Sequence, residues 1–279
     1  MIPTLTLPDG RQVPTLGQGT WHMGENRRAP AAEATALRLG IELGMTLIDT
    51  AEMYGDGGAE QIVGTAIEGQ RDAVFLVSKV YPHNASRTGV PAACERSLRR
   101  LRTERIDLYL LHWQGSHPLA ETIAAFETLK QAGKIGAWGV SNFDAGDMAR
   151  LVRLPGGVGC ATDQVLYNPA ARGIEFDLLP WSAKQRMPVM AYSPIGQGGR
   201  LLRSPALAAV AQRHHATPAQ VAIAWSLRGG NVVAIPMAGD PKHVRENAAA
   251  ADLALTARDL TEIDAAFPPP KGKQALEIL

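Results

Sequence analysis

The stretch Asp107-Leu108-Tyr109-Leu110-Leu111-His112 decides the fold, because its four central residues are all large and apolar. A strand with one face in water alternates polar and apolar residues, whereas a continuous apolar run is typical of a parallel strand covered on both faces. Val74-Phe75-Leu76-Val77 repeats the pattern earlier in the chain. These two runs therefore predict a parallel sheet with helices packed on it.

Apolar runs of this kind alternate with longer helix-like segments along the whole chain, which is the pattern of repeated βα units. Eight strands are expected, at residues 15–20, 46–49, 74–79, 107–112, 137–141, 161–164, 189–192 and 232–235. Helix patterns lie between them, for example at residues 31–43, 89–101, 119–132 and 218–228. Thr217-Pro218 and Asp240-Pro241 are typical of an N-cap followed by proline at the first helical position. Eight consecutive units predict an α/β fold of the (β/α)8, or TIM barrel, type.

Both ends of the chain carry additions to this barrel. Asp9-Gly10 stands between two short alternating stretches and predicts an N-terminal β-hairpin, expected to cap the closed end of the barrel. Residues 256–267 resemble a final helix, which Pro268-Pro269-Pro270 cannot continue, so a short irregular tail is expected. No linker or change of composition divides the chain, and residues 1–279 are expected to form a single domain.

Composition limits the classes of partner. The chain has 28 Lys and Arg against 27 Asp and Glu, and this balance argues against nucleic acid as a partner. There is no cationic leader and no apolar run of about 18 residues, so a soluble cytoplasmic protein without a membrane partner is expected. Cys94 and Cys160 lie in unrelated contexts and are expected to be buried small residues, with no metal site.

Four side chains end the predicted strands or closely follow them: Asp49, Tyr54, Lys79 and His112. The C-terminal ends of barrel strands meet at one mouth, so these groups are expected to converge. A neighbouring Lys79 would lower the pKa of Tyr54, Asp49 would hold Lys79 protonated, and His112 would bond a substrate oxygen. Each residue alone could be an ordinary structural group, but together they can protonate an alkoxide as it forms on a carbonyl.

The same residues carry a resemblance to a known family. The stretch from Asp49 to Gly55, the strand end at Lys79, Leu111-His112-Trp113, Gly139-Val140-Ser141-Asn142-Phe143 and Ala191-Tyr192-Ser193-Pro194 occur in the order found in the aldo-keto reductase superfamily. The resemblance implies an NAD(P)H-dependent carbonyl reductase with Asp49, Tyr54, Lys79 and His112 as a catalytic tetrad and Tyr54 as the general acid. The closing Phe267-Pro268-Pro269-Pro270 and the short tail resemble bacterial members related to methylglyoxal reductase.

A Rossmann site does not account for the cofactor, because Gly17-Gln18-Gly19 lacks the third glycine of that fingerprint. The resemblance instead implies binding at the barrel mouth. Ser141, Asn142 and Gln164 would hold the nicotinamide carboxamide beside Asp49, and Tyr192 would stack on the ring. Gly19, Thr20 and Trp21 would approach it from the first loop.

The phosphate end is expected on two later segments. Ser193, Pro194 and Gly196 belong to a glycine-bearing loop that would cross the pyrophosphate, and the helix opening at Asp240-Pro241 would add its positive end. Where many relatives read Ile-Pro-Lys-Ser and then Arg, this chain has Ile235, Met237, Ala238 and His243. Lys242 and Arg245 would supply charge, and Glu246 and Asn247 would lie near the adenine. NADPH is the expected cofactor, with NADH as the alternative.

An apolar substrate pocket is expected on the mouth loops, formed by Trp21, Met23, Met53, Tyr81 and Trp113. Because the tail is short, an open pocket is expected, suited to small aldehydes, ketoaldehydes or dicarbonyls such as methylglyoxal. The expected protein is a monomer that acts on a small carbonyl compound. Two alternatives remain open at this point: a nicotinamide-sensing binding module with little turnover, and a metal-dependent barrel isomerase.

Overall fold

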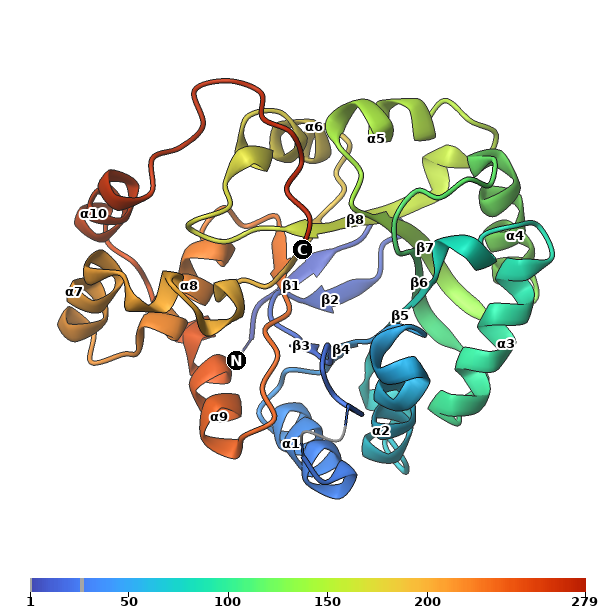
Figure 1. The fold of residues 1–279 in the computed structure, drawn as a ribbon, viewed down its shortest axis with the longest axis horizontal. Helices are drawn as coiled ribbons and strands as arrows, with labels where there is room; N and C mark the ends of the chain where they lie inside the picture. Colours follow the sequence, from blue (N-terminus) through green and yellow to red (C-terminus); the bar gives the residue numbers. More distant parts are fainter. Residues whose placement is uncertain (1, 26–27) are drawn as a thin grey trace.

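The computed structural model describes residues 2–25 and 28–279 and shows a barrel of parallel strands ringed by helices (Figure 1). The eight strands follow the order β10-β9-β8-β7-β6-β5-β4-β3 across the sheet. Their bounds are β3 Gln18–Gly19, β4 Leu47–Asp49, β5 Phe75–Val80, β6 Ile106–Leu111, β7 Ile135–Ser141, β8 Cys160–Leu166, β9 Val189–Tyr192 and β10 Val232–Ala234. Parallel bridges from Leu16 to Ala234 and from Gly19 to Met237 join the two edges. The predicted barrel is therefore confirmed.

The first strand is shorter than the predicted 15–20, because only Gln18 and Gly19 pair with β4. The residues before them turn to the last strand instead. The amide of Gly17 donates to the Ala234 oxygen at 2.9 Å, and the Ala234 amide donates to the Thr15 oxygen at 2.8 Å. This segment therefore closes the barrel rather than extending the sheet.

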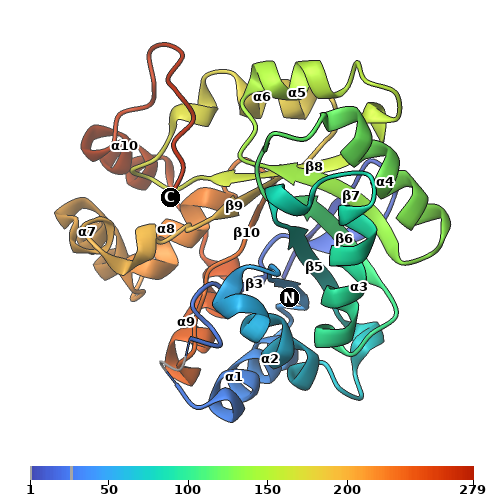
Figure 2. The same cartoon turned by 45° about the vertical axis from the view of Figure 1, so that its right-hand side comes forward.

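The helices form the outer ring of the barrel (Figures 1 and 2). Their bounds are α1 Pro30–Glu42, α2 Gly58–Ala66, α3 Gly89–Leu101, α4 Leu119–Gln131, α5 Ala145–Leu151, α6 Leu178–Lys184, α7 Pro205–Arg213, α8 Pro218–Leu227, α9 Pro241–Ala249 and α10 Ala257–Ala266. Both predicted N-caps are confirmed, because Thr217 accepts the Gln220 amide at 3.3 Å and Asp240 accepts the Lys242 amide at 2.9 Å.

The central strands are buried on both faces, as their continuous apolar runs predict. On β6, Leu108 and Leu110 pack in the cluster that fills the barrel, while Tyr109 and Leu111 pack in the cluster beneath the helices. The outer cluster includes an aromatic contact in which the Tyr109 and Phe126 ring centroids lie 5.8 Å apart. Every residue of β6 is therefore out of water, which explains why the run carries no alternation.

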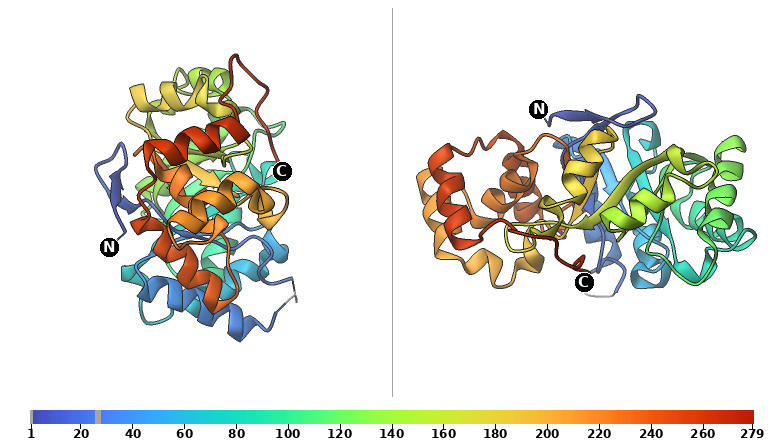
Figure 3. Two further views of the ribbon diagram at one scale, coloured as in Figure 1. Left: turned by 90° about the vertical axis from the view of Figure 1, so that its left-hand side faces the viewer. Right: turned by 90° about the horizontal axis from the view of Figure 1, so that it is seen from above.

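The N-terminal hairpin covers the end of the barrel away from the C-terminus (Figure 3). It pairs β1 Thr4–Thr6 with β2 Gln12–Pro14, antiparallel. Gly10 in the turn has a φ of 88°, which glycine adopts without steric penalty. Leu7 and Val13 pack into the cluster inside the barrel, so the hairpin closes that end as predicted.

After α10 the chain runs as an irregular tail that returns to the barrel and ends beside β8 and β9 (Figures 1 and 2). The Lys273 amine lies 3.5 Å from Asp144 and 3.6 Å from Asp177. Cys94 and Cys160 are buried free thiols, as predicted. Within residues 2–25 and 28–279, no helix has the length and apolar character that crossing a bilayer requires.

Candidate active site

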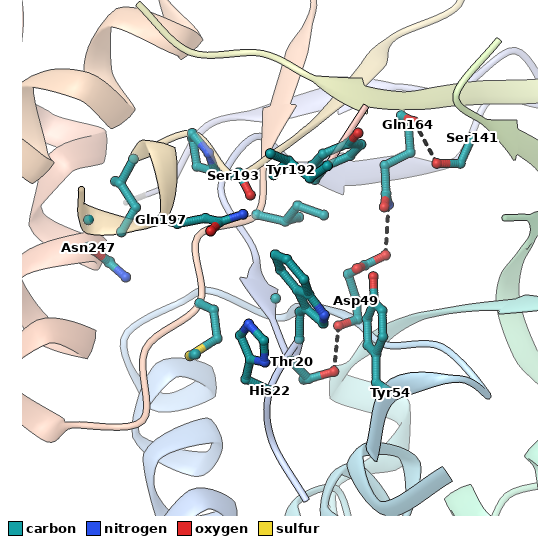
Figure 4. Close-up of a pocket in the computed structure, with 18 of the residues that line it drawn as sticks. Thr20, His22, Asp49, Tyr54, Ser141, Gln164, Tyr192, Ser193, Gln197 and Asn247 are labelled. Atoms are coloured by element: carbon teal, nitrogen blue, oxygen red, sulfur yellow. Dashed lines mark hydrogen bonds between the residues drawn. The ribbon is translucent and has the colours of Figure 1, made fainter. Parts of the chain in front are cut away.

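A cavity of about 1170 Å³ opens at the C-terminal ends of the strands. Asp49 ends β4, Ser141 ends β7 and Tyr192 ends β9, while Gln164 lies within β8. Figure 4 shows these side chains directed into the same space. The topology brings together groups that are far apart in the sequence, because parallel strands present their C-terminal ends at one edge.

Lys79 is at the centre of the polar cluster and has no exposed surface. Its amine donates to Asp49 Oδ2 at 2.7 Å, to the Thr50 oxygen at 2.9 Å and to the Tyr54 hydroxyl oxygen at 3.3 Å. An ammonium has three N–H donors and no acceptor, so these contacts satisfy it. Since the Tyr54 oxygen accepts from Lys79, its own proton is free to point into the cavity.

Burial controls the titration of this cluster. It raises the pKa of Tyr54 well above the ordinary value, and the charge of Asp49 raises it further. The net shift of the Tyr54 pKa is therefore upward and not downward as expected, because burial and the charge of Asp49 outweigh the effect of the neighbouring ammonium. Burial also raises the pKa of Asp49 and lowers that of Lys79, and in both cases the ion pair opposes the effect.

His112 lies next to the tetrad phenol, with its ring centroid 5.6 Å from that of Tyr54. Burial, together with the charge of Lys79, lowers the pKa of His112 well below the ordinary value. The imidazole is therefore neutral near pH 7. Among the described residues its Nδ1 atom has no hydrogen-bond partner.

The residues expected to hold a carboxamide form one hydrogen-bonded group. Asn142 donates to the His112 oxygen and to Ser141 Oγ, each at 3.1 Å, and accepts from the Tyr192 hydroxyl at 2.9 Å. Gln164 donates to Asp49 Oδ1 at 2.7 Å, which connects this group to the tetrad. Burial raises the pKa of Tyr192 to about 12. All of these side chains are therefore fixed before any ligand binds.

Several non-glycine residues around the same cavity have a positive φ. Asn142 has a φ of 63°, Ser193 of 48°, Gln197 of 57° and His22 of 74°. These left-handed conformations are unfavourable for residues other than glycine and concentrate at ligand sites. Four of the eight non-glycine residues with positive φ in the described part of the chain thus line one cavity, which is typical of a ligand site.

Most of the residues predicted to contact the cofactor line the cavity: Gly19, Thr20, Trp21, Asp49, Ser141, Asn142, Gln164, Tyr192, Ser193, Pro194, Ile235, Met237, His243, Glu246 and Asn247. On α9 these residues share one helix face, since 243, 246 and 247 are three and four positions apart. Lys242 and Arg245 are exposed and do not line the cavity, although the Lys242 amine lies 3.8 Å from the lining residue Glu246. Gly196 and Ala238 are also absent from the lining.

The predicted apolar wall needs two corrections. Trp21, Met53 and Trp113 line the cavity, but Met23 and Tyr81 do not. Met23 is 1% exposed and packs in the core, and Tyr81 lies edge-on to Trp113 with ring centroids 5.1 Å apart. Loop residues near a mouth can point either way, and sequence alone does not distinguish the two directions.

The sequence reasoning missed several lining residues, among them His22, Gln197, Thr217, Ile278 and Leu279. Thr217 could have been found from its helix-start signal, because helix N-termini often face bound anions. Ile278 and Leu279 gave no signal, since their place depends on the tail returning across the barrel. The tail therefore contributes to the wall of the pocket, and the expectation that this pocket is more open than those of relatives with long C-terminal loops stays a prediction.

Known proteins resemble this chain in both fold and sequence. A model of the Aldo/keto reductase family matches residues 15–267. The chain belongs to the aldo/keto reductase family. It is 54% identical over 271 residues to methylglyoxal reductase YeaE of Escherichia coli strain K12, covering 96% of this chain and 95% of that protein. A glyoxal reductase of Bacillus subtilis is 32% identical over 265 residues, covering 94% and 92%.

Solved structures support the assignment of this chain to the aldo/keto reductase family. An aldo/keto reductase from Klebsiella pneumoniae, in complex with NADP and acetate, matches with a TM-score of 0.97 and 48% identity, covering 100% of both chains. A second Klebsiella pneumoniae aldo-keto reductase structure, in complex with NADPH, matches equally well. The resemblance seen in the sequence motifs is thus confirmed, and the protein is a carbonyl reductase by family.

Proposed function

We propose that this chain reduces small aldehydes, ketoaldehydes and dicarbonyls such as methylglyoxal to alcohols with NADPH, and that Tyr54 is the general acid. The observation that carries the proposal is the contact of the Lys79 amine with both Asp49, at 2.7 Å, and the Tyr54 hydroxyl, at 3.3 Å. A bound reduced nicotinamide would supply the hydride. The proton has to come from the protein, and Tyr54 is placed to give it.

The cavity fits an extended dinucleotide. Its volume of about 1170 Å³ exceeds the range of roughly 300–1,000 Å³ usual for sites of small ligands. Figure 4 shows Tyr54 and Asp49 at one side and Asn247 at the other, with Tyr192 and Gln197 between them. This arrangement supports a nicotinamide beside Tyr192, Ser141, Asn142 and Gln164 and an adenosine end beside α9.

Each tetrad residue has a distinct task. The raised pKa of Tyr54 keeps its proton at neutral pH until an alkoxide forms. Lys79 then stabilises the phenolate that remains, because an opposite charge in contact favours the ionised form. Asp49 keeps Lys79 oriented, and the neutral His112 can donate one hydrogen bond to the carbonyl oxygen.

The phosphate groups of the cofactor would meet few positively charged side chains on the cavity wall. In the described part of the chain the wall includes His22 and His243 but no Lys or Arg. We infer that the backbone of the 193–198 loop and the first turns of α8 and α9 bind most of the anion, with Lys242 and Arg245 adding positive charge at the rim. NADPH is assigned because the similar Klebsiella pneumoniae structures hold NADP and NADPH.

The assignment to small carbonyls rests on the E. coli relative named methylglyoxal reductase and on the shape of the wall. Trp21, Met53 and Trp113 form an apolar side, and Ile278 and Leu279 of the tail add to the lining. Such apolar walls are typical of small-molecule sites, in which a few polar groups, here those of the tetrad, orient the ligand.

The matched variants Tyr54→Phe and Tyr109→Phe test the proposal. Tyr109 lies on the outer face of β6 against Phe126, so its variant makes the same chemical change outside the site. We expect Tyr54→Phe to lose about 10²–10⁴-fold in kcat with methylglyoxal, measured by loss of NADPH absorbance, while NADPH affinity by fluorescence titration is kept. Full turnover in Tyr54→Phe would overturn the acid assignment, and no turnover in the unmodified protein would overturn the function.

We further propose that the protein acts as a monomer in the cytoplasm, with residues 1–279 as one domain. One chain supplies the tetrad, the cavity wall and the tail that contributes to it. Sedimentation analysis is expected to give a mass near 29.8 kDa, and a dimer at micromolar concentration would refute the proposed monomer.

A further inference from the structure

Glu52 has a set of contacts that the tetrad does not explain. It lies between Asp49 and Tyr54, and its side chain is 8% exposed. One carboxylate oxygen accepts the Tyr81 amide at 2.8 Å and the Asn84 side-chain amide at 2.9 Å. The other lies 3.3 Å from the guanidinium of Arg96 on α3. A buried carboxylate with three donors is a fixed group.

These contacts connect the two segments that carry the acid and its ammonium. The Glu52 amide donates to the Lys79 oxygen at 3.3 Å, and its carboxylate holds the amide of Tyr81 two residues later. Tyr54 follows Glu52 by two residues on the other segment. Glu52 therefore links the two segments by two hydrogen bonds, one from its own amide and one to its carboxylate, beside the 3.3 Å contact between Tyr54 and Lys79.

A series of aromatic ring contacts connects Tyr81 to Tyr54 along the substrate side of the site. The Tyr81 and Trp113 ring centroids are 5.1 Å apart, those of Trp113 and His112 are 5.0 Å apart, and those of His112 and Tyr54 are 5.6 Å apart. Glu52 fixes the backbone at Tyr81 and so supports the ring that lies behind Trp113. Displacement of Tyr81 would reach His112 and Tyr54 through packed neighbours.

We propose that Glu52 is a positioning residue for the reduction, holding Tyr54 against Lys79 and fixing the Trp113 wall through Tyr81. It touches no reacting atom and acts through the backbone of the two loops that it connects. The inference rests on the proposed role of Tyr54 as the acid. A displacement of about 1 Å at a reacting group can lower a rate by up to about 10²-fold, so the loss of these bonds would be visible in kcat.

Asp107 offers a matched control at the start of β6, on the closed side of the barrel. It is also buried, accepts the Leu76 amide at 2.9 Å and pairs with Arg71 at 2.7 Å and Arg105 at 3.2 Å. Its role in structure resembles that of Glu52, but it lies on the side away from the tetrad. Variants at the two positions separate loss of stability from loss of positioning.

The experiment compares Glu52→Ala, Glu52→Asp and Glu52→Gln with Asp107→Asn in NADPH-dependent reduction of methylglyoxal. We expect kcat to fall about tenfold or more in Glu52→Ala, with an unchanged KM for NADPH. Glu52→Asp keeps the charge but is shorter, and an intermediate fall is expected. Glu52→Gln keeps an acceptor for the Tyr81 amide and should restore most of kcat. Asp107→Asn should lower Tm without lowering kcat.

A double variant distinguishes this inference from the proposed function. In a Tyr54→Phe background, Glu52→Ala should cause a much smaller further loss, because the part of its effect that acts through the Tyr54 hydroxyl is already gone. If Glu52→Ala does not fold, the comparison of Glu52→Asp with Glu52→Gln decides the question, because kcat should be lower in Glu52→Asp than in Glu52→Gln. Unchanged kcat in the folded Glu52 variants, while Tyr54→Phe is inactive, would overturn the positioning role and leave the acid in place. Activity in Tyr54→Phe would overturn the proposed function instead.

Discussion

Replacement of Lys79 by Met tests the electrostatics of the site most directly. The side chain is fully buried, and Met has a similar length without the charge. The change leaves Asp49, 2% exposed, with Gln164 as its remaining hydrogen-bond donor among the described residues. Removing one partner of a buried ion pair costs about 3–5 kcal/mol, because the other charge stays out of water. We therefore expect the free energy of unfolding to fall by about that amount.

The loss has a pH signature. Without Lys79 the pKa of Asp49 should rise further above its unfolded value, so the folded state binds a proton more tightly than the unfolded chain. Stability of the variant should then fall as pH rises from the unfolded pKa towards the folded pKa, by about 1.4 kcal/mol per unit, and level off above it. Urea unfolding of both proteins between pH 5 and pH 8 measures the difference.

Two further variants control this prediction. Lys273→Met also removes an amine near two carboxylates, Asp144 and Asp177, but that amine is on a side chain 54% exposed. Exposed pairs contribute about 0–1 kcal/mol, so little change is expected. Adding Asp49→Asn to Lys79→Met should restore most of the stability and none of the turnover. If Lys79→Met is as stable as the unmodified protein at pH 8, the buried pair is not charged and the reasoning is wrong.

Three other predictions concern stability and the cofactor end. The pKa of His112 is lowered on folding, so the unfolded chain binds more protons below about pH 6.5 and stability should fall as pH falls through that value; thermal unfolding should show a weaker acid dependence in His112→Gln. Asp259 completes the capping box of α10 with Thr256 and accepts from Arg213 at 2.7 Å, so Asp259→Asn should lose about 2 kcal/mol of unfolding free energy at pH 7 by urea unfolding. That loss should shrink in acid, because the lowered pKa of Asp259 stabilises the fold fully above the unfolded value and progressively less below it; an equal loss at pH 3 would contradict this reasoning. A Cβ at Gly19 would lie 2.7 Å from the Ile235 oxygen, so Gly19→Ala should part β3 from β10, lower Tm and weaken NADPH binding in a fluorescence titration. Gly10→Ala, with open space around its Cβ but a φ of 88°, should lower Tm without changing NADPH affinity.

The sequence by itself determined the barrel and indicated the four polar side chains proposed as the tetrad. A strand covered on both faces is apolar throughout, and the run from Leu108 to Leu111 shows this pattern within four consecutive residues. It can therefore be recognised without knowledge of the rest of the chain. Strand ends then place Asp49, Lys79 and His112 at one mouth, because a parallel barrel has a single carboxyl edge. Helix starts at Thr217 and Asp240 were equally readable, since capping depends on neighbours in sequence.

Only the tertiary structure decided the direction of the pKa shift of Tyr54, the burial of Met23 in the core and the path of the C-terminal tail. Each depends on contacts between residues distant in sequence. The net effect of Lys79 on Tyr54 depends on how closely Asp49 pairs with the ammonium and on how much water is excluded, and neither has a local signal. Ile278 and Leu279 reach the cavity because the tail carrying Lys273, held near Asp144 and Asp177, returns to the barrel mouth. Burial and long-range charge are properties of the assembled fold.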